Sequence, residues 1–250
     1  MSPVPTARAG LREPLIAFAI TTGLAAACAA LGAAVPLVRR NLSLAIAIIF
    51  FLAPLAVARR AGRSEEFDYR EVGLHVDPVG LNLRVLGVFV LLAFSGFVAG
   101  FFLFYDRVCA LSAGPLARWF APMCERWLGY AGGHLRLPPN FWLLSASYLI
   151  VVAIPEEVFF RGYLMERLER VWPPTRTLFG AKVGWALIVS SALFALSHVA
   201  VIPNPQRLAV FFPALLFGWM RARTGSIAPG ALFHALCNIL SDVMHASFFS

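Results

Sequence analysis

The sequence predicts an all-α, polytopic transmembrane helix bundle. The chain has 250 residues, of which 60% are hydrophobic and 14% charged, and its mean hydropathy is +0.76. A soluble domain of this size could not cover so much apolar surface, and lipid tolerates only helical bundles or closed barrels. The apolar stretches are long and continuous rather than alternating, which favours helices over a barrel.

Seven apolar segments are expected to cross the membrane, and the second and sixth are the shortest. They cover residues 14–38, 42–58, 84–105, 141–165, 184–203, 207–220 and 227–249. The first segment is too long for a signal-peptide core and no clear cleavage site follows it, so we expect it to be retained. The charged segments 59–83 and 166–183 are expected to be aqueous loops. Segment 106–140 mixes Arg, Gly, Pro and Trp, which suits short helices at the membrane interface.

The chain is expected to form a single membrane domain over residues 1–250, because no internal repeat or low-complexity linker divides it. The polar motifs described below all fall within residues 141–249, which we expect to be the motif-bearing core of this domain. Residues 1–140 would supply the N-terminal spans and the interfacial segment, and carry no motif that we can assign.

Charge asymmetry between the loops predicts the orientation of the chain. With seven spans, fourteen of the 21 Lys and Arg residues fall on the side of the N-terminus. The other seven lie at 39–40, 107–136 and 207. Since Lys and Arg concentrate in cytoplasmic loops, we expect a multi-pass protein of the cell (inner) membrane with a cytoplasmic N-terminus and an external C-terminus. The formal charge of +8 therefore reflects topology and does not indicate nucleic-acid binding.

The four cysteines form no CxxC pair. Cys28 and Cys237 lie inside apolar runs, so we expect them to be packing residues. Cys109 and Cys124 share one connecting segment, and their spacing leaves open whether they form a disulfide.

Two carboxylates and an arginine follow directly on the apolar run 141–155. Ionisable groups at membrane depth are costly and by default mark a functional site. Glu157 and Arg161 are four residues apart and can pair on one helical face. Glu156 is rotated by about 100° from Glu157, so we expect it to face the interior of the bundle. The alternative is that the group is a solvated ion pair at a cytoplasmic helix end.

Two later apolar segments each carry a pair of residues at helical spacing. His198 stands four residues after Phe194, and Asn238 stands four residues after His234, so each pair lies on one helical face. Taken alone, His198 could be a packing histidine, and His234 with Asn238 could form hydrogen bonds that hold neighbouring helices together. An unpaired buried carboxylate costs several kcal/mol, which favours convergence of these residues on the glutamates.

These residue types suit hydrolysis of an acyl group, most naturally a peptide bond. Glu156 with His198 could polarise a water molecule, while His234 with Asn238 could donate hydrogen bonds to a developing oxyanion. A serine triad is not favoured, because no GxSxG motif is present. Glu156, His198 and His234 could instead bind zinc as a His₂Glu site, although the sequence contains no HExxH.

The motifs stand in one order on successive apolar segments, as Glu156-Glu157-x-x-x-Arg161, Phe194-x-x-x-His198 and His234-x-x-x-Asn238. In this they resemble the CAAX-protease and bacteriocin-processing (CPBP) family of glutamic intramembrane proteases, of the Rce1-like type. The resemblance covers roughly residues 141–249. It implies a helical bundle around a polar cavity within the membrane, and proteolysis that needs no metal or other cofactor. The implied partners are the lipid bilayer and a membrane-associated protein or peptide substrate.

The resemblance also implies a role for each motif residue by position. Glu156 and His198 would activate the water, and His234 and Asn238 would form the oxyanion hole. Supporting residues would be Glu157 and Arg161. Two further polar residues of the last segment, Asp242 and His245, lie outside the motifs. We expect them to form hydrogen bonds between helices.

This mechanism sets a geometric condition on the fourth span. If the span ended at Pro155, Glu156 would lie at the cytoplasmic surface, roughly 20 Å from His198 at 1.5 Å rise per residue. Cooperation therefore requires the helix to continue to about Met165, with Pro155 as a kink. Glu156 would then lie near the middle of the membrane.

Three other functions remain open from the sequence. A non-catalytic CPBP-like protein, such as a bacteriocin-immunity or regulatory partner, would tolerate replacement of Glu156. A zinc-dependent variant of the same protease site is the second. A transporter using Glu156, His198 and His234 as proton carriers is the third, but the repeats that such proteins contain are not evident. The sequence does not select among prenylated C-termini, peptide precursors and sorting signals as substrates, and indicates no oligomeric state.

Overall fold

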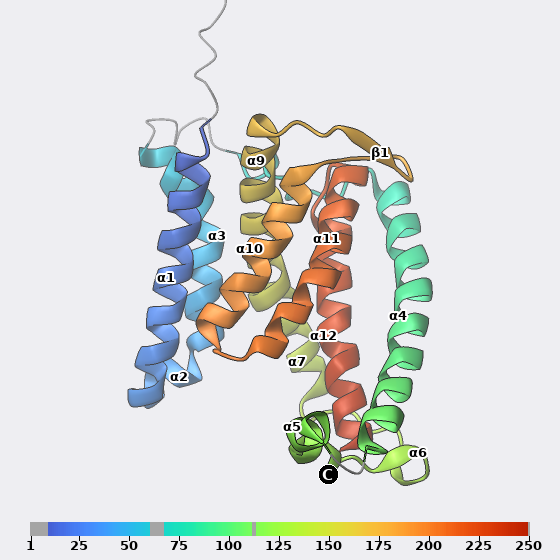
Figure 1. Cartoon of the computed structure of the whole chain (residues 1–250). Helices are drawn as coiled ribbons and strands as arrows, with labels where there is room; N and C mark the ends of the chain where they lie inside the picture. The colour runs from blue at the N-terminus through green and yellow to red at the C-terminus, as the bar shows by residue number, and fades with distance from the viewer. Residues whose placement is uncertain (1–9, 61–67, 112–113, 250) are drawn as a thin grey trace, which may run out of the picture.

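The computed structural model describes residues 10–60, 68–111 and 114–249, and within them the chain is mostly helical. Long helices stand side by side along one common direction (Figure 1). Part of the predicted aqueous segment 59–83, including Arg63, Glu65 and Glu66, lies outside the described residues, as does Arg8.

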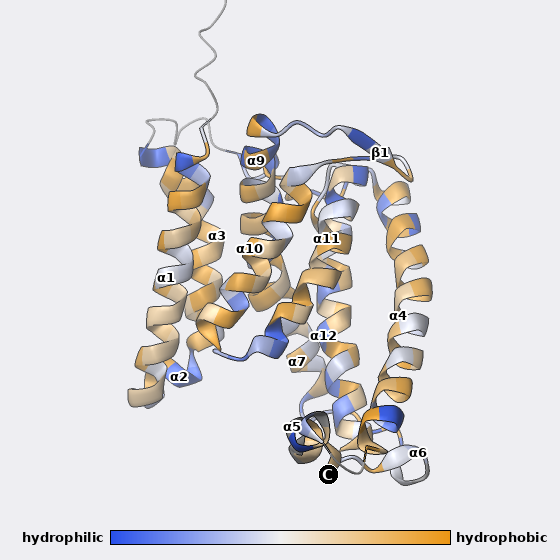
Figure 2. Cartoon of the chain, viewed as in Figure 1, coloured by the Kyte–Doolittle hydropathy of each residue, from blue (hydrophilic) through white to orange (hydrophobic). Residues whose placement is uncertain are grey.

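Four helices are long and apolar enough to cross a membrane, and they coincide with the first four predicted spans. They are α1 (Arg12–Ala34), α3 (Leu42–Arg60), α4 (Val79–Cys109) and the continuous helical stretch Phe141–Val171. Figure 2 shows hydrophobic residues along the length of α1, α3 and α4 and hydrophilic residues near their ends. Four candidate transmembrane helices indicate a multi-pass membrane protein.

Three further helices occupy the positions of the last three predicted spans. They are α10 (Trp185–Val201), α11 (Phe211–Thr224) and α12 (Ala228–Phe248). With 14 residues, α11 is about 21 Å long, less than the roughly 30 Å of a hydrocarbon core. The 3₁₀ segment η3 (Pro205–Val210) joins α10 to α11 part-way along the bundle rather than at its end (Figure 1). The count of seven spans therefore stays a prediction.

The fourth span continues through Pro155, as the catalytic interpretation requires. It consists of α7 (Phe141–Ser147), the π-helical η1 (Tyr148–Ala153), α8 (Ile154–Glu157), the π-helical η2 (Val158–Leu164) and α9 (Met165–Val171). Proline removes one backbone donor from a helix, and here wider π-helical turns lie on both sides of it. Such turns occur mostly as local bulges and often at functional sites.

Short elements close the two ends of the bundle. At one end lie α2 (Pro36–Arg40), which joins α1 to α3, and the predicted interfacial helices α5 (Pro115–Cys124) and α6 (Gly129–Gly132). Cys109 and Cys124 form a disulfide here, which settles the pairing that the sequence left open. We call this the disulfide end. Nearby, the Leu128 amide donates to the Phe248 carbonyl over 2.9 Å.

The opposite end carries a small sheet that the all-α prediction missed. Strand β1 (Arg176–Leu178) pairs with β2 (Ala181–Val183) in an antiparallel hairpin, and we call this the hairpin end. Gly180, with a φ of 81°, supplies the left-handed conformation that a two-residue turn needs. Segment 166–183 is therefore not one loop, because α9 occupies its start and the hairpin its end.

The main core packs around the fourth span. Phe159, Phe160 and Leu164 are fully buried there, in contact with residues of α1, α3 and α10. Arg161 is fully buried among them, so it is wrong to count this residue as a loop charge. By contrast, α4 buries only Asn82 and Val85, which leaves most of its apolar surface free to face lipid.

Candidate active site

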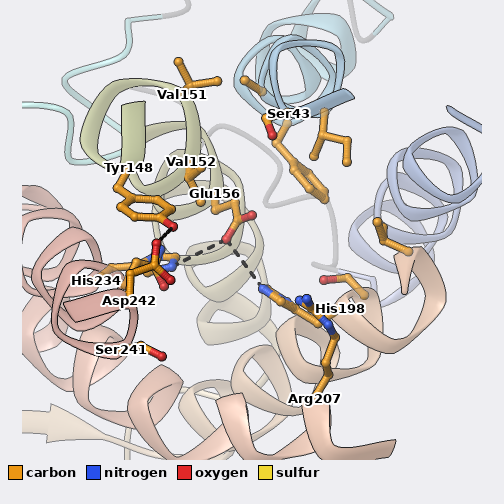
Figure 3. Close-up of a pocket in the computed structure, with 16 residues that line it drawn as sticks. Ser43, Tyr148, Val151, Val152, Glu156, His198, Arg207, His234, Ser241 and Asp242 are labelled. Atoms are coloured by element: carbon orange, nitrogen blue, oxygen red, sulfur yellow. Dashed lines mark hydrogen bonds and ion pairs between the residues drawn. The ribbon is translucent and has the colours of Figure 1, made fainter. Parts of the chain in front are cut away.

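Three helices bring the predicted water-activating residues together. Glu156 lies on α8, His198 near the end of α10, and His234 on the first half of α12. The Glu156 Oε2 atom lies 4.0 Å from His198 Nε2 and 3.9 Å from His234 Nε2 (Figure 3). The condition that Glu156 and His198 approach each other is therefore met. The position of Glu156 near the middle of the membrane stays a prediction.

Helical rotation separates the two adjacent glutamates, as the sequence predicts. The Glu156 side chain is 12% exposed and lines a cavity, while the Glu157 side chain is completely buried. The Oε2 atom of Glu156 is buried and has no hydrogen-bond partner among the described residues. This carboxylate is thus available to a molecule in the cavity.

Glu157 and Arg161 form a buried ion pair. Arg161 Nη1 lies 2.9 Å from Glu157 Oε1, and both side chains are fully buried. Arg161 Nη2 donates to the Ala214 carbonyl of α11 over 3.1 Å. The guanidinium also lies over the rings of Phe194 and Phe217, at 4.3 and 5.2 Å from their centroids. The alternative of a solvated pair at a helix end is therefore wrong.

His234 lies between the two carboxylates. Its Nδ1 atom is 3.3 Å from Glu157 Oε1, and its Nε2 atom points toward Glu156. A hydrogen bond from one ring nitrogen fixes the tautomer and orientation of an imidazole. Glu157 thus holds His234 directly as well as Arg161. No spacing pattern predicts this contact, since 77 residues separate the two positions.

His198 is oriented by its own helix. Its Nδ1 atom lies 2.9 Å from the Phe194 carbonyl oxygen, the residue four positions earlier in the FxxxH motif. A carbonyl only accepts, so Nδ1 is the donor. In the neutral ring, Nε2 then faces Glu156 as an acceptor. The motif spacing therefore sets both the position and the tautomer of this histidine.

A cavity of about 380 Å³ contains the four predicted catalytic residues. Glu156, His198, His234 and Asn238 all line it. Asn238 lies one helical turn beyond His234, on the face of α12 that borders the cavity. The structure therefore brings together all four residues that the motif resemblance implies.

Two further lining residues were not anticipated as part of the site. Tyr148, on η1, donates a hydrogen bond to Asp242 Oδ2 on α12 (Figure 3). This bond joins two helices, so Asp242 makes the interhelical hydrogen bond that we expected of it.

Arg207, on the α10–α11 connection, also lines the cavity. His245 instead stacks on Phe249, with ring centroids 4.8 Å apart.

The zinc alternative finds no support in the donor arrangement. In the part of the chain that the structure describes, no three His, Cys, Asp or Glu side chains are grouped so that they could hold a metal ion. Glu156, His198 and His234 converge, but not as a His₂Glu ligand set.

Comparison with known proteins agrees with the motif resemblance. Residues 138–240 match the family model described as type II CAAX prenyl endopeptidase Rce1-like. No curated protein and no solved structure matches the chain. The matched segment contains the ion pair, both histidines and all other predicted site residues. Residues 138–240 therefore belong to the Rce1-like CAAX protease family, within the CPBP family.

Proposed function

We propose that this protein is an intramembrane endopeptidase that hydrolyses a peptide bond of a membrane-associated protein or peptide. The observation that carries the proposal is the approach of Glu156 Oε2 to two imidazole Nε2 atoms at 4.0 and 3.9 Å, inside a cavity. The family match supports proteolysis as the activity, because the family is one of CAAX endopeptidases.

We assign the role of general base to Glu156 and His198 acting together. Their 4.0 Å separation is too long for a direct hydrogen bond, and a water molecule beside the gap can bond to both groups. That water donates one hydrogen to the Glu156 carboxylate and the other to His198 Nε2. Attack on the substrate carbonyl then releases a proton to the pair, which can return it to the leaving amine.

His234 and Asn238 are the proposed oxyanion donors. In the imidazolium form both nitrogens of His234 donate, so Nδ1 can serve Glu157 while Nε2 serves the developing oxyanion. The Asn238 side-chain amide supplies a second donor from the same face of α12. Loss of one such donor typically costs about 10²–10³ in rate.

Glu157 and Arg161 are proposed to position the site rather than contact substrate. Both are completely buried behind Glu156. Through its Oε1 atom, Glu157 accepts from Arg161 and from His234. This arrangement holds the imidazole in place before the substrate arrives, which is the preorganisation that electrostatic catalysis requires.

A serine nucleophile is not supported by the local geometry. Ser197 lines the cavity next to His198, but its hydroxyl donates to the Phe194 carbonyl of its own helix over 2.7 Å. The hydroxyl proton is therefore directed away from the imidazole that would have to remove it.

Purified protein in proteoliposomes, mixed with a library of tagged single-span membrane peptides, tests the proposal. Mass spectrometry identifies the cut peptides, and initial rates are compared for the wild type, Glu156→Gln, His198→Ala and Asn238→Ala. Glu166→Gln is the matched control, because this carboxylate lies on the same continuous helix outside the cavity.

Three outcomes separate the alternatives. Cleavage that persists in Glu156→Gln would rule out the water-activating role of this residue. No cleavage of any peptide by the wild type, with intact binding, would favour a non-catalytic CPBP-like protein. Loss of wild-type cleavage in a membrane-permeant chelator would favour the zinc-dependent variant.

A further inference from the structure

We propose that the cavity opens toward the non-cytoplasmic face of the membrane, so that the substrate is an exported polypeptide cut outside the cytoplasm. The identification of the occupant as a substrate rests on the proposed protease function. The direction of the opening and the orientation of the chain rest on separate observations.

The cavity extends from Glu156 toward the disulfide end. On α3 its lining residues fall between Ser43 and Phe50, in the half of that helix that begins at α2 (Figure 1). On α12 the lining continues past Asn238 to Ser241 and Asp242, again toward the disulfide end. Ser43 and Ser241 are both exposed, so each marks a point where the cavity meets the outside.

The connection between α10 and α11 lies beside the cavity. The turn at η3 lies part-way along the bundle and does not reach the disulfide end (Figure 1). Arg207 of η3 lines the cavity and reaches toward His198 (Figure 3). The connection therefore borders the entrance instead of covering it.

Toward the hairpin end the cavity is closed by packed side chains. Every residue from Val158 to Leu164 is buried, and Phe194 and Phe217 pack on the same layer with at most 2% exposure. Gly162 fits directly under segment 68–78, since a Cβ atom there would lie 2.3 Å from the Val72 carbonyl oxygen. A peptide cannot reach Glu156 through this layer without unpacking it.

Charge distribution assigns the hairpin end to the cytoplasm. Among the described residues, with the buried Arg161 and the cavity-lining Arg207 left out, eleven Lys and Arg residues lie on the side of the hairpin end. Six lie at the disulfide end, namely Arg39, Arg40, Arg107, Arg118, Arg126 and Arg136. The positive-inside rule therefore places the disulfide end outside.

The disulfide agrees with this orientation independently of charge. Cys109 and Cys124 are bonded at the disulfide end, and disulfides persist in oxidising compartments rather than in the reducing cytoplasm. The cavity mouth and the disulfide thus share the external face. A prenylated cytosolic protein would meet the closed end of the bundle, whereas an exported segment would meet the open one.

Cysteine labelling from one side of the membrane tests the proposal without requiring activity. Single cysteines are placed at Ser43→Cys and Ser241→Cys in the cavity mouth, in a protein that keeps its disulfide but carries Cys28→Ala and Cys237→Ala. Leu135→Cys, 80% exposed at the disulfide end, and Lys182→Cys in the exposed part of the hairpin are the two controls. The probe is a membrane-impermeant maleimide, applied to intact cells and to inverted vesicles.

In intact cells, both cavity cysteines should be labelled together with Leu135→Cys, and Lys182→Cys should not. Inverted vesicles should give the reverse pattern. The proposal is overturned if the cavity cysteines are labelled together with Lys182→Cys, or if neither is labelled from either side while both controls are. External labelling of a protein that cuts no peptide would retain the inferred opening and reject only the proposed protease function.

Discussion

Replacing Arg161 with methionine should destabilise the bundle by about 3–5 kcal/mol, the usual cost of removing one partner of a buried ion pair. Arg161 is fully buried, 2.9 Å from Glu157, and its loss leaves the Glu157 carboxylate charged in a site that water does not reach. The bond to the Ala214 carbonyl and the contacts with the two phenylalanine rings disappear as well.

The same helical stretch offers a matched control. Glu166 and Arg170 are also a Glu–Arg pair four residues apart, but the Arg170 side chain is 53% exposed. Exposed pairs contribute about 0–1 kcal/mol, so Arg170→Met should cost less than about 1 kcal/mol. The comparison holds residue type and spacing constant and changes the burial of the pair together with the further contacts of its arginine.

The measurement is reversible unfolding by SDS in mixed micelles, followed by circular dichroism. The double variant Glu157→Gln with Arg161→Met should cost less than Arg161→Met alone, because no uncompensated charge remains. If Arg161→Met and Arg170→Met prove equally mild, or if the double variant equals the sum of its single variants, the reasoning about the buried pair is wrong.

Three other stability changes follow from the contacts. Gly162→Ala should cost about 1–3 kcal/mol by overpacking, because its Cβ atom would meet the Val72 carbonyl at 2.3 Å; an unchanged SDS midpoint would contradict this. Removing the disulfide by Cys109→Ser with Cys124→Ser should cost up to about 3 kcal/mol for a loop of this length, and a melting temperature insensitive to reductant would contradict it. Tyr148→Phe should cost about 1.5–3 kcal/mol, since it removes a hydrogen bond to a charged group; differential scanning fluorimetry in detergent can measure the loss.

Hydropathy predicted the positions of the helices well, for a physical reason. Lipid requires long apolar segments whose backbone bonds are internal, so the first four spans could be located from composition alone. The pairs Glu157–Arg161 and Phe194–His198 could also be predicted, because residues four apart share a helical face.

Contacts between helices could not be predicted in this way. The Glu157–His234 bond and the Tyr148–Asp242 bond join positions 77 and 94 residues apart, and no spacing rule relates such positions. Their partners are set by how α12 packs against the fourth span. The direction that we propose for the cavity opening has the same origin, since it follows from which parts of α3 and α12 line the cavity.

Arg161 shows that the neighbouring sequence alone does not decide whether a charged residue is exposed. Next to an apolar run and ahead of a charged segment, it resembled a loop arginine that sets topology. Its burial depends on the helix continuing past Pro155 and on Glu157 to neutralise it. The mechanism requires this continuation, and the burial of Arg161 that results removes the residue from the charge count.

Cleavage by Glu156→Gln tests the central claim most directly. The variant keeps the size and most of the hydrogen-bonding capacity of the side chain but removes the base that faces His198 and His234. On a peptide that the wild type cuts in proteoliposomes, the account predicts a rate lower by at least about 10²-fold, the scale of general acid–base catalysis, with an unchanged unfolding midpoint. A rate equal to that of the wild type would contradict it.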